Sequence, residues 1–324
     1  MKRIAFLILS AISITSFATK PLMIERQGQF PIGGTTIQRP GTFDPDTFVG
    51  WTNPIQDGQT YRCNHAFARY QIPVQAKKLP LVFVHGFGSD GVCWETTPDG
   101  RDGFATLLLR ESYPTYVLDL PGRGHASRTS TDVTIKPVAD EEFWFDIWRM
   151  GLWPEWNEGV QFPTDSLSVS NFFRQMVPDL SDHKQDIVAL DAEVKGVVAL
   201  EPGGFVFPED EVPEALPGLT GGLSGIPVLL EKFMELTRKP IVILYGDYIP
   251  ESGATTLGGS NWEVRLKMAR EFVNAINRHG GNATLIELPK IGIKGNSHFL
   301  MQELNNDVIA ALVAEWLSNN GLSE

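Results

Sequence analysis

Short apolar runs that end in turn residues recur along the chain and predict β-strands. Their length and their content of Val, Ile and aromatic residues are typical of strands buried in a core. These runs are Ala68–Pro73, Leu81–His85, Thr115–Leu120, Val197–Glu201, Ile241–Gly246 and Thr284–Leu288. Apolar residues at helical spacing predict helices over Asp102–Glu111, Asn261–His279 and Asp307–Ser318. This alternation predicts an α/β fold with a mostly parallel sheet and helices on both faces.

The first eighteen residues have the pattern of a secretory signal. Lys2 and Arg3 precede the mostly apolar stretch Ile4–Ile14, and small residues follow at Ser16–Ala18. The apolar stretch is shorter than the ~20 residues that a membrane span needs, and no other segment could cross a bilayer. We therefore expect a secreted or periplasmic protein without membrane insertion.

The mature chain divides into an N-terminal arm and one large domain. Residues 19–67 are rich in Gly, Pro and Thr without clear periodicity, which predicts an irregular arm that could include a hairpin. Residues 68–324 hold the predicted strands and helices, and we interpret them as one domain.

Residues 128–180 interrupt the alternation and are rich in aromatic side chains. Half of the eight tryptophans lie there. The segment predicts a cap insertion over a site. Its rings could line a pocket, or they could only pack the cap onto the body. They include Phe143, Trp144, Phe145, Trp148, Trp153, Trp156 and Phe162.

Charge and cysteine content narrow the possible partners. The net charge of −12 disfavours nucleic acid and anionic membranes, and no basic patch offsets it. The two cysteines, Cys63 and Cys93, predict a disulfide in an oxidising compartment, with two separate buried thiols as the alternative. The six histidines are scattered, so no metal site is predicted. The oligomeric state is not predicted.

A glycine-rich turn after the second predicted strand matches a dinucleotide-binding fingerprint. The stretch Gly86–Gly91 has the spacing G-x-G-x-x-G, and Asp119 ends the next strand. That fingerprint needs a helix opening at its second glycine, with its N-terminus directed at the pyrophosphate. Here Pro98–Gly100 comes before any helix, so we predict no nicotinamide and no other cofactor.

Several motifs together resemble secreted bacterial esterases of the α/β-hydrolase superfamily, in the bifunctional-esterase or arylesterase-like branch. The likeness covers most of the mature chain, and the block around Trp94 is its most specific part. The matching stretches are His85–Gly88, Trp94–Gly103, Asp119–Gly124, Leu200–Gly203, Tyr245–Asp247 and Ile291–Phe299.

The resemblance implies hydrolysis of small-molecule carboxylic esters by a serine, an acid and a histidine base. It implies His298 as the base, and either Glu201 or Asp247 as the acid that orients it, with Glu201 favoured in this branch. Backbone amides near Phe87 and Gly88 would form part of an oxyanion hole. The resemblance also places Cys63 and Trp94 near the pocket.

The expected catalytic serine is absent from this sequence. Sixteen residues lie between Met176 and Glu193, whereas a helix, a strand, the nucleophile turn and a second helix need about thirty. We interpret this as deletion of the central strand with its G-x-S-x-G turn. Ser224 lies between glycines but has no preceding strand, and Ser181 has no glycine context.

The sequence therefore predicts an ester hydrolase that is impaired or inactive. One alternative is a non-catalytic relative that binds an ester or another apolar ligand. In a second alternative, Glu201 acts as a carboxylate nucleophile, because Ala199–Gly203 places it between small residues after a strand. Pro202 opposes this second alternative, because it has no N–H to donate to an oxyanion.

Overall fold

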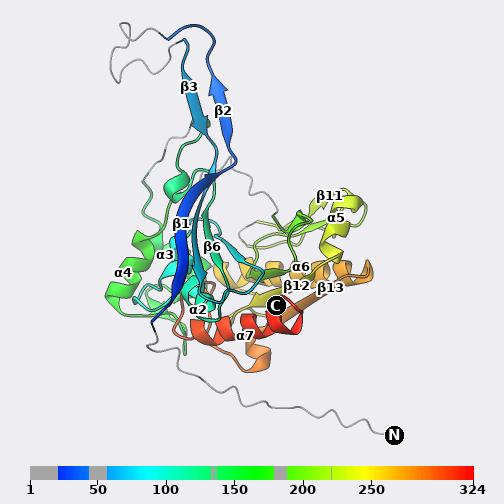
Figure 1. The fold of residues 1–324 in the computed structure, drawn as a ribbon. Helices are drawn as coiled ribbons and strands as arrows, with labels where there is room; N and C mark the ends of the chain where they lie inside the picture. Colours follow the sequence, from blue (N-terminus) through cyan, green and yellow to red (C-terminus); the bar gives the residue numbers. More distant parts are fainter. Residues whose placement is uncertain (1–20, 44–56, 133–134, 136, 179–187, 220) are drawn as a thin grey trace.

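Two separate β-sheets form the framework of the described part of the chain (Figure 1). The computed structural model describes residues 21–43, 57–132, 135, 137–178, 188–219 and 221–324. The predicted signal segment and Ser181 lie outside these ranges. The first sheet has the order β1-β4-β6-β5 and the second β13-β12-β9. Their bounds are β1 Ile24–Ile32, β4 Ala66–Pro73, β5 Leu81–Val84, β6 Thr115–Asp119, β9 Val197–Leu200, β12 Pro240–Tyr245 and β13 Asn282–Glu287.

Strand direction agrees with the prediction in the second sheet and only partly in the first. Strands β9, β12 and β13 are parallel to one another, and β5 is parallel to β6. Strand β4 runs antiparallel to both β1 and β6. An apolar run identifies a strand but does not fix its direction, so the sequence could not show this difference.

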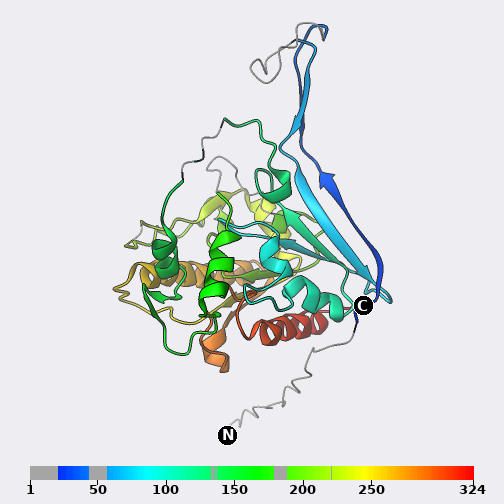
Figure 2. The same ribbon diagram turned by 90° about the vertical axis from the view of Figure 1, so that its left-hand side faces the viewer.

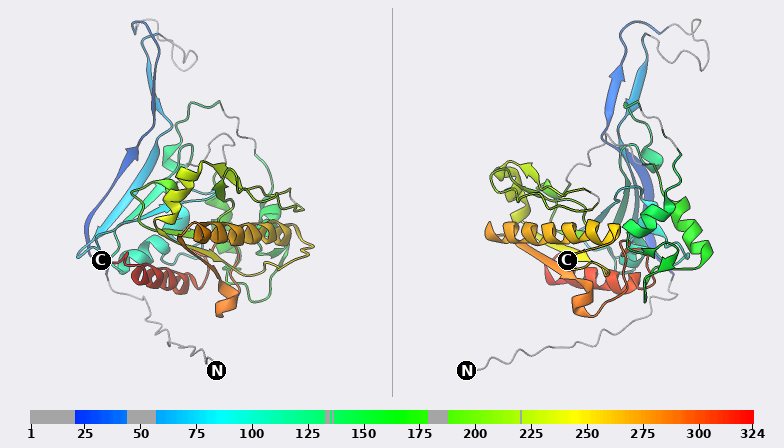
Figure 3. Two further views of the ribbon diagram at one scale, coloured as in Figure 1. Left: turned by 90° about the vertical axis from the view of Figure 1, so that its right-hand side faces the viewer. Right: turned by 180° about the vertical axis from the view of Figure 1, so that it is seen from behind.

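Helices cover both faces of the second sheet, as predicted. Side chains alternate between the faces of a strand, and Val242 and Leu244 of β12 pack with α2 (Phe104–Arg110) and α7 (Asn306–Asn319). Their neighbours Ile241, Ile243 and Tyr245 pack with α6 (Leu257–Arg278). Figure 3 shows α6 and α7 on either side of these strands.

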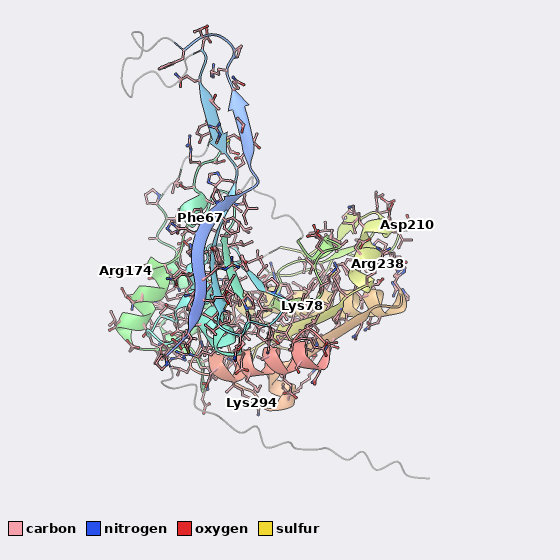
Figure 4. The ribbon with its side chains drawn as sticks, in the orientation of Figure 1. Phe67, Lys78, Arg174, Asp210, Arg238 and Lys294 are labelled. Atoms are coloured by element: carbon pink, nitrogen blue, oxygen red, sulfur yellow. The ribbon has the colours of Figure 1, made fainter. Side chains whose placement is uncertain are left out.

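The N-terminal arm is more regular than predicted. Its described part forms β1, β2 (Thr35–Gln38) and β3 (Thr60–Cys63). Strand β1 pairs with β4 along most of its length although most of its side chains are exposed. An edge strand with one paired side needs no apolar face, so its pattern did not predict it. Strands β2 and β3 form a hairpin that projects from the body (Figures 1 and 2), and in Figure 4 its side chains stand apart from the crowded interior.

The aromatic insertion packs against the start of helix α6. It contains α3 (Glu141–Ile147), β7 (Gly151–Leu152), β8 (Glu155–Trp156) and α4 (Ser166–Arg174). The Asp165 side chain accepts hydrogen bonds from the Leu167 and Ser168 amides and caps α4. Four of its rings are fully or almost fully buried: Phe145, Trp148, Phe162 and Phe172. Packing onto the body therefore accounts for many of these rings.

The remaining elements are short, and the longest of them is helix α5. They are α1 (Val92–Glu95), α5 (Leu230–Thr237), β10 (Val206–Pro208), β11 (Ile226–Val228) and the 3₁₀ turns Gly124–Ala126, Val188–Leu190 and Leu288–Ile291. None of the helices in the described ranges is long and apolar enough to cross a membrane.

Candidate active site

Glu201 and His298 form a hydrogen-bonded pair at the carboxyl edge of the second sheet. Glu201 directly follows β9, and His298 lies in the loop between β13 and α7. The Oε2 atom of Glu201 is 2.9 Å from Nδ1 of His298. Because parallel strands end at one edge of a sheet, the fold brings together two residues that are 97 positions apart in sequence.

The carboxylate of Glu201 is completely buried and fully hydrogen-bonded. Its Oε1 atom accepts hydrogen bonds from Nη2 of Arg149 at 2.5 Å and from the Gly246 amide at 2.6 Å. Burial opposes ionisation, but the charge of Arg149 and the hydrogen bond to His298 outweigh it and hold the pKa of Glu201 below its ordinary value. The group is therefore a carboxylate at neutral pH.

The backbone of Glu201 is in the left-handed region, with φ of 46°. This conformation is uncommon for a residue other than glycine, and such strain is concentrated at functional sites. The Glu201 amide donates to the carbonyl of Leu244 at 2.9 Å, which fixes the turn to β12.

The imidazole of His298 is held in a mostly apolar setting. Its ring lies 4.2 Å from the Trp262 ring and 4.9 Å from the Phe299 ring, between centroids. Burial lowers the pKa of His298 more than Glu201 raises it, and the positive charges of Arg149 and Arg265 lower it further. The ring is thus neutral near pH 7, the state in which it can act as a base.

The second ring nitrogen of His298 has no protein partner in the ranges that the structure covers. The ring's side-chain hydrogen bond is the one from Nδ1 to Glu201, and Nε2 makes none with any described residue. No described serine or threonine hydroxyl lies within hydrogen-bond distance of Nε2. Ser224 is exposed in the loop before β11 and makes no hydrogen bond to His298.

Asp247 supports the loop of His298 and does not contact its ring. Its Oδ2 atom accepts a hydrogen bond from the Gly295 amide at 3.0 Å, and its own amide donates to the Asn296 carbonyl at 2.7 Å. Of the two predicted acids, the structure brings Glu201 to the imidazole and Asp247 to the backbone of the loop.

The loop after β5 carries the predicted oxyanion residues Phe87 and Gly88. The Leu120 amide donates to Nε2 of His85 at 3.1 Å, so Nδ1 of that ring holds the proton and donates to the Gly86 carbonyl at 2.9 Å. Burial lowers the pKa of His85, which keeps its ring neutral. Gly88 has φ of 66°, which favours glycine at the turn. Phe87 is 53% exposed and contacts Trp144.

Trp94 lies in the core on the first sheet, away from the acid–histidine pair. It is 8% exposed, and its ring packs between those of Phe83 and Phe104, 5.3 and 6.1 Å away. The structure assigns it a packing position and does not bring it to His298.

The predicted disulfide between Cys63 and Cys93 is wrong. Both are free buried thiols. Cys63 ends β3 in the hairpin register opposite Thr35, whereas Cys93 lies in α1 within the core around α2 and α7. A disulfide needs Cβ atoms about 4 Å apart, and compartment and cysteine number say nothing about that geometry. Burial raises the pKa of the Cys93 thiol far above its ordinary value, so it is unreactive.

A second buried acid, Glu303, lies beneath the histidine loop. It accepts hydrogen bonds from the Ser297 amide and from Nδ2 of Asn296, both at 2.5 Å. Burial and the nearby Glu201 raise its pKa to about 7 despite these bonds. Nothing in the sequence distinguishes this acid from an exposed residue in the segment before α7.

A cavity of about 520 Å³ lies elsewhere, between α4 and the loop after α1. Its lining includes Thr96, Asp99, Asp165 and Asn171, and it includes neither Glu201 nor His298. The acid–histidine pair is therefore the better candidate for chemistry.

Sequence reasoning did not find Arg149 or Trp262. Arg149 belongs to the insertion, whose lack of periodicity gave no indication of which side chains turn inward. Trp262 lies in the predicted helix Asn261–His279, where its residue type predicts only packing against the core. Its ring contacts His298, and its indole N–H donates to the Ile147 carbonyl at 2.7 Å.

Comparison with known proteins supports a hydrolase. No protein-family model matches the chain. A fungal protein described as a probable secreted lipase, phiG (Fungal sp., strain ATCC 74256), is 26% identical over 301 residues, covering 74% of this chain and 81% of the relative. A solved structure titled "The Atomic Resolution Structure of a Novel Bacterial Esterase" has 27% identity and a TM-score of 0.71, covering 93% of this chain and 98% of its own. These similarities support an esterase- or lipase-like hydrolase with the α/β-hydrolase type of fold.

Proposed function

We propose that the chain carries the acid–base part of a secreted carboxylic ester hydrolase and, lacking its serine, hydrolyses small-molecule esters weakly or not at all. The observation that carries this proposal is the hydrogen bond between buried Glu201 and His298, combined with an Nε2 atom that has no hydroxyl partner among the described residues. The acid holds the ring so that Nδ1 keeps its proton and Nε2 is free to accept one.

In an intact site of this kind, Nε2 would take the proton of a serine as that serine attacks the ester carbonyl. The amides near Phe87 and Gly88 would donate to the oxyanion that develops. Without the serine, the remaining route is attack by a water molecule whose proton passes to His298 and then to the leaving alkoxide. General base assistance of this kind gives only about 10²–10⁴-fold.

The division into two sheets supports loss of the nucleophile strand. Strand β5 ends one sheet and β9 ends the other, and the predicted deletion between Met176 and Glu193 lies between these two strands in the sequence. Val82 of β5 is 53% exposed, unlike a residue in the middle of a covered sheet.

The contacts of Glu201 favour its role as the orienting acid over the alternative of a carboxylate nucleophile. A nucleophile must present an oxygen to the substrate. Both oxygens of Glu201 are occupied by Arg149, the Gly246 amide and His298, and the side chain has no exposed area.

The test is hydrolysis of p-nitrophenyl acetate and butyrate by the unaltered protein and by His298→Ala. We expect rates close to those of buffer for both. Turnover at an ordinary enzymatic rate that disappears in His298→Ala would show that a nucleophile is present and would overturn the proposed loss.

A binding function is the second candidate, and one surface feature favours it. Phe87 and Phe143 are exposed and both contact the ring of Trp144. Saturable quenching of tryptophan fluorescence by p-nitrophenyl butyrate, without turnover and reduced in Phe87→Ala, would support it.

A further inference from the structure

An arginine from the aromatic insertion reaches the buried acid of the candidate site. Arg149 follows α3, and its side chain is 1% exposed. Its Nη2 atom donates to Oε1 of Glu201 at 2.5 Å, and its Nε atom donates to the backbone carbonyl of Asp247 at 2.9 Å. One guanidinium thus holds the residue after β9 and the residue that braces the histidine loop.

The backbone of Arg149 is itself fixed for this contact. Its φ of 61° is in the left-handed region, and its carbonyl accepts a hydrogen bond from Nδ2 of Asn157 at 2.7 Å. The neighbouring Trp148 carbonyl accepts the His298 amide at 3.1 Å. Two consecutive residues of the insertion therefore hold the acid and the base.

Packing alone does not account for an arginine at this position. The Nη1 atom is buried and has no hydrogen-bond partner in the described part of the chain, which costs free energy. An apolar side chain of similar volume would avoid that cost. The guanidinium supplies what such a side chain could not: a positive charge and two donors in a fixed plane.

We propose that Arg149 is a positioning residue that keeps Glu201 ionised and aimed at His298. A role for Arg149 in catalysis rests on the proposed function. Its effect on the ionisation and position of Glu201 and His298 does not depend on that function. Arg149 acts through Glu201 and does not contact the ring nitrogen that would accept a proton.

The trio is joined by one tryptophan. The Arg149 guanidinium lies 4.8 Å from the centre of the Trp262 ring, and the same ring lies 4.2 Å from the His298 ring. Arg265 of α6 also lies over this ring, 5.4 Å away, but it makes no ion pair with Glu201. Arg265 thus provides a matched control for the loss of a nearby charge.

The charges around Glu201 and His298 determine the direction in which the apparent pKa should shift when Arg149 is replaced. Glu201 from the end of β9, Arg149 from the insertion and Arg265 from α6 act on His298, while Glu303 beneath the loop feels Glu201. Removing Arg149 leaves a buried negative charge that a proton can neutralise. The acid–histidine pair should then take up its proton at a higher pH, by about 1–3 units.

The experiment is an NMR titration of the His298 ring in the unaltered protein and in Arg149→Gln, Arg149→Lys and Arg265→Gln. We expect an upward shift in the apparent pKa of about 1–3 units for Arg149→Gln. Arg149→Lys, which keeps the charge, should titrate close to the unaltered protein, and Arg265→Gln should shift less than Arg149→Gln. An apparent pKa in folded Arg149→Gln equal to that of the unaltered protein would overturn the proposal.

A second measurement needs no substitution. In the unaltered protein, the side-chain ¹⁵N signals of Arg149 should be protected from exchange and should move with the same apparent pKa as the His298 ring. Fast exchange and no common titration would overturn the proposal even if every Arg149 variant fails to fold. Neither measurement depends on turnover, so an inactive protein leaves this test intact.

Discussion

Each oxygen of Glu201 has a defined partner, and this explains why it rather than Asp247 faces His298. Both acids follow neighbouring parallel strands, β9 and β12, so their positions and charges in the sequence are equivalent. The left-handed backbone of Glu201 turns its side chain beneath the imidazole, whereas Asp247 is held by the Gly295 amide. The sequence could narrow the acid to two residues, but it could not predict that backbone conformation or the arginine that stabilises it.

Glu303 makes the stability of the fold dependent on pH. Its pKa is raised from an ordinary 4.5 to about 7 in the folded protein, so its contribution is fully present below pH 4.5 and is lost as the pH rises towards 7. The loss is on the order of 3 kcal/mol. We expect Glu303→Gln to reduce the fall in the free energy of unfolding between pH 5 and 7, measured by urea denaturation.

The exposed Glu209 provides the control for this titration. Glu209→Gln should leave the dependence on pH as it is in the unaltered protein. If Glu303→Gln also keeps the full dependence, then Glu303 is not the group responsible.

At the scale of the elements, the apolar pattern predicted the buried strands and helices and missed an exposed strand. The six predicted strands and three predicted helices are confirmed within a few residues. Strand β1 was missed because it is mostly polar and exposed at a sheet edge. Helix α6 begins at Leu257, before the predicted Asn261, because the Thr256 hydroxyl caps it by accepting the Gly259 amide at 3.0 Å. Its first turn contains Gly258 and Gly259, and a pair of glycines in a sequence is typical of a loop.

One of these glycines permits the close approach of α6 to the insertion. A Cβ atom at Gly258 would overlap the carbonyl oxygen of Asp146 in α3. In an open helix, replacing Gly with Ala stabilises by about 1 kcal/mol. Here we expect Gly258→Ala to destabilise by about 1–3 kcal/mol, because backbone atoms have to move. Thermal and urea unfolding would measure this.

Gly204 is a matched control, because an added Cβ there would meet only Ile226, at an ordinary 3.9 Å. Gly204→Ala should leave stability almost unchanged. A Gly258→Ala protein as stable as the unaltered one would mean that α3 and α6 are not in close backbone contact.

At the scale of the whole molecule, the two sheets divide the candidate site. The sheet ending in β5 carries the loop with Phe87 and Gly88, and the sheet ending in β9 carries Glu201 and the histidine loop. Strands β5 and β9 each lie at the edge of a sheet in the described part of the chain, and such edges are sites of self-association in β-proteins. The sequence showed only a shortage of residues between Met176 and Glu193, because the spacing of motifs does not show how the flanking strands are arranged.

This division predicts the effect of restoring a central strand. We expect a chimera in which a strand, a G-x-S-x-G turn and a helix are inserted between Met176 and Glu193 to melt at a higher temperature. It should also hydrolyse p-nitrophenyl butyrate in a His298-dependent manner. The same chimera with its nucleophile serine changed to alanine should keep the stability and lose the activity. A folded chimera with neither gain would contradict the interpretation of a lost strand.

The hydrogen bond from the His298 amide to Trp148 and the ion pair of Arg149 have a consequence for protein engineering. They bear on any attempt to exchange the aromatic insertion for another segment. In this molecule the aromatic insertion carries Arg149, the positive charge that pairs with Glu201, so a replacement segment without an equivalent arginine would remove that ion pair from the candidate site. A replacement of the insertion would therefore have to keep Trp148 and Arg149 in place beside His298 and Glu201.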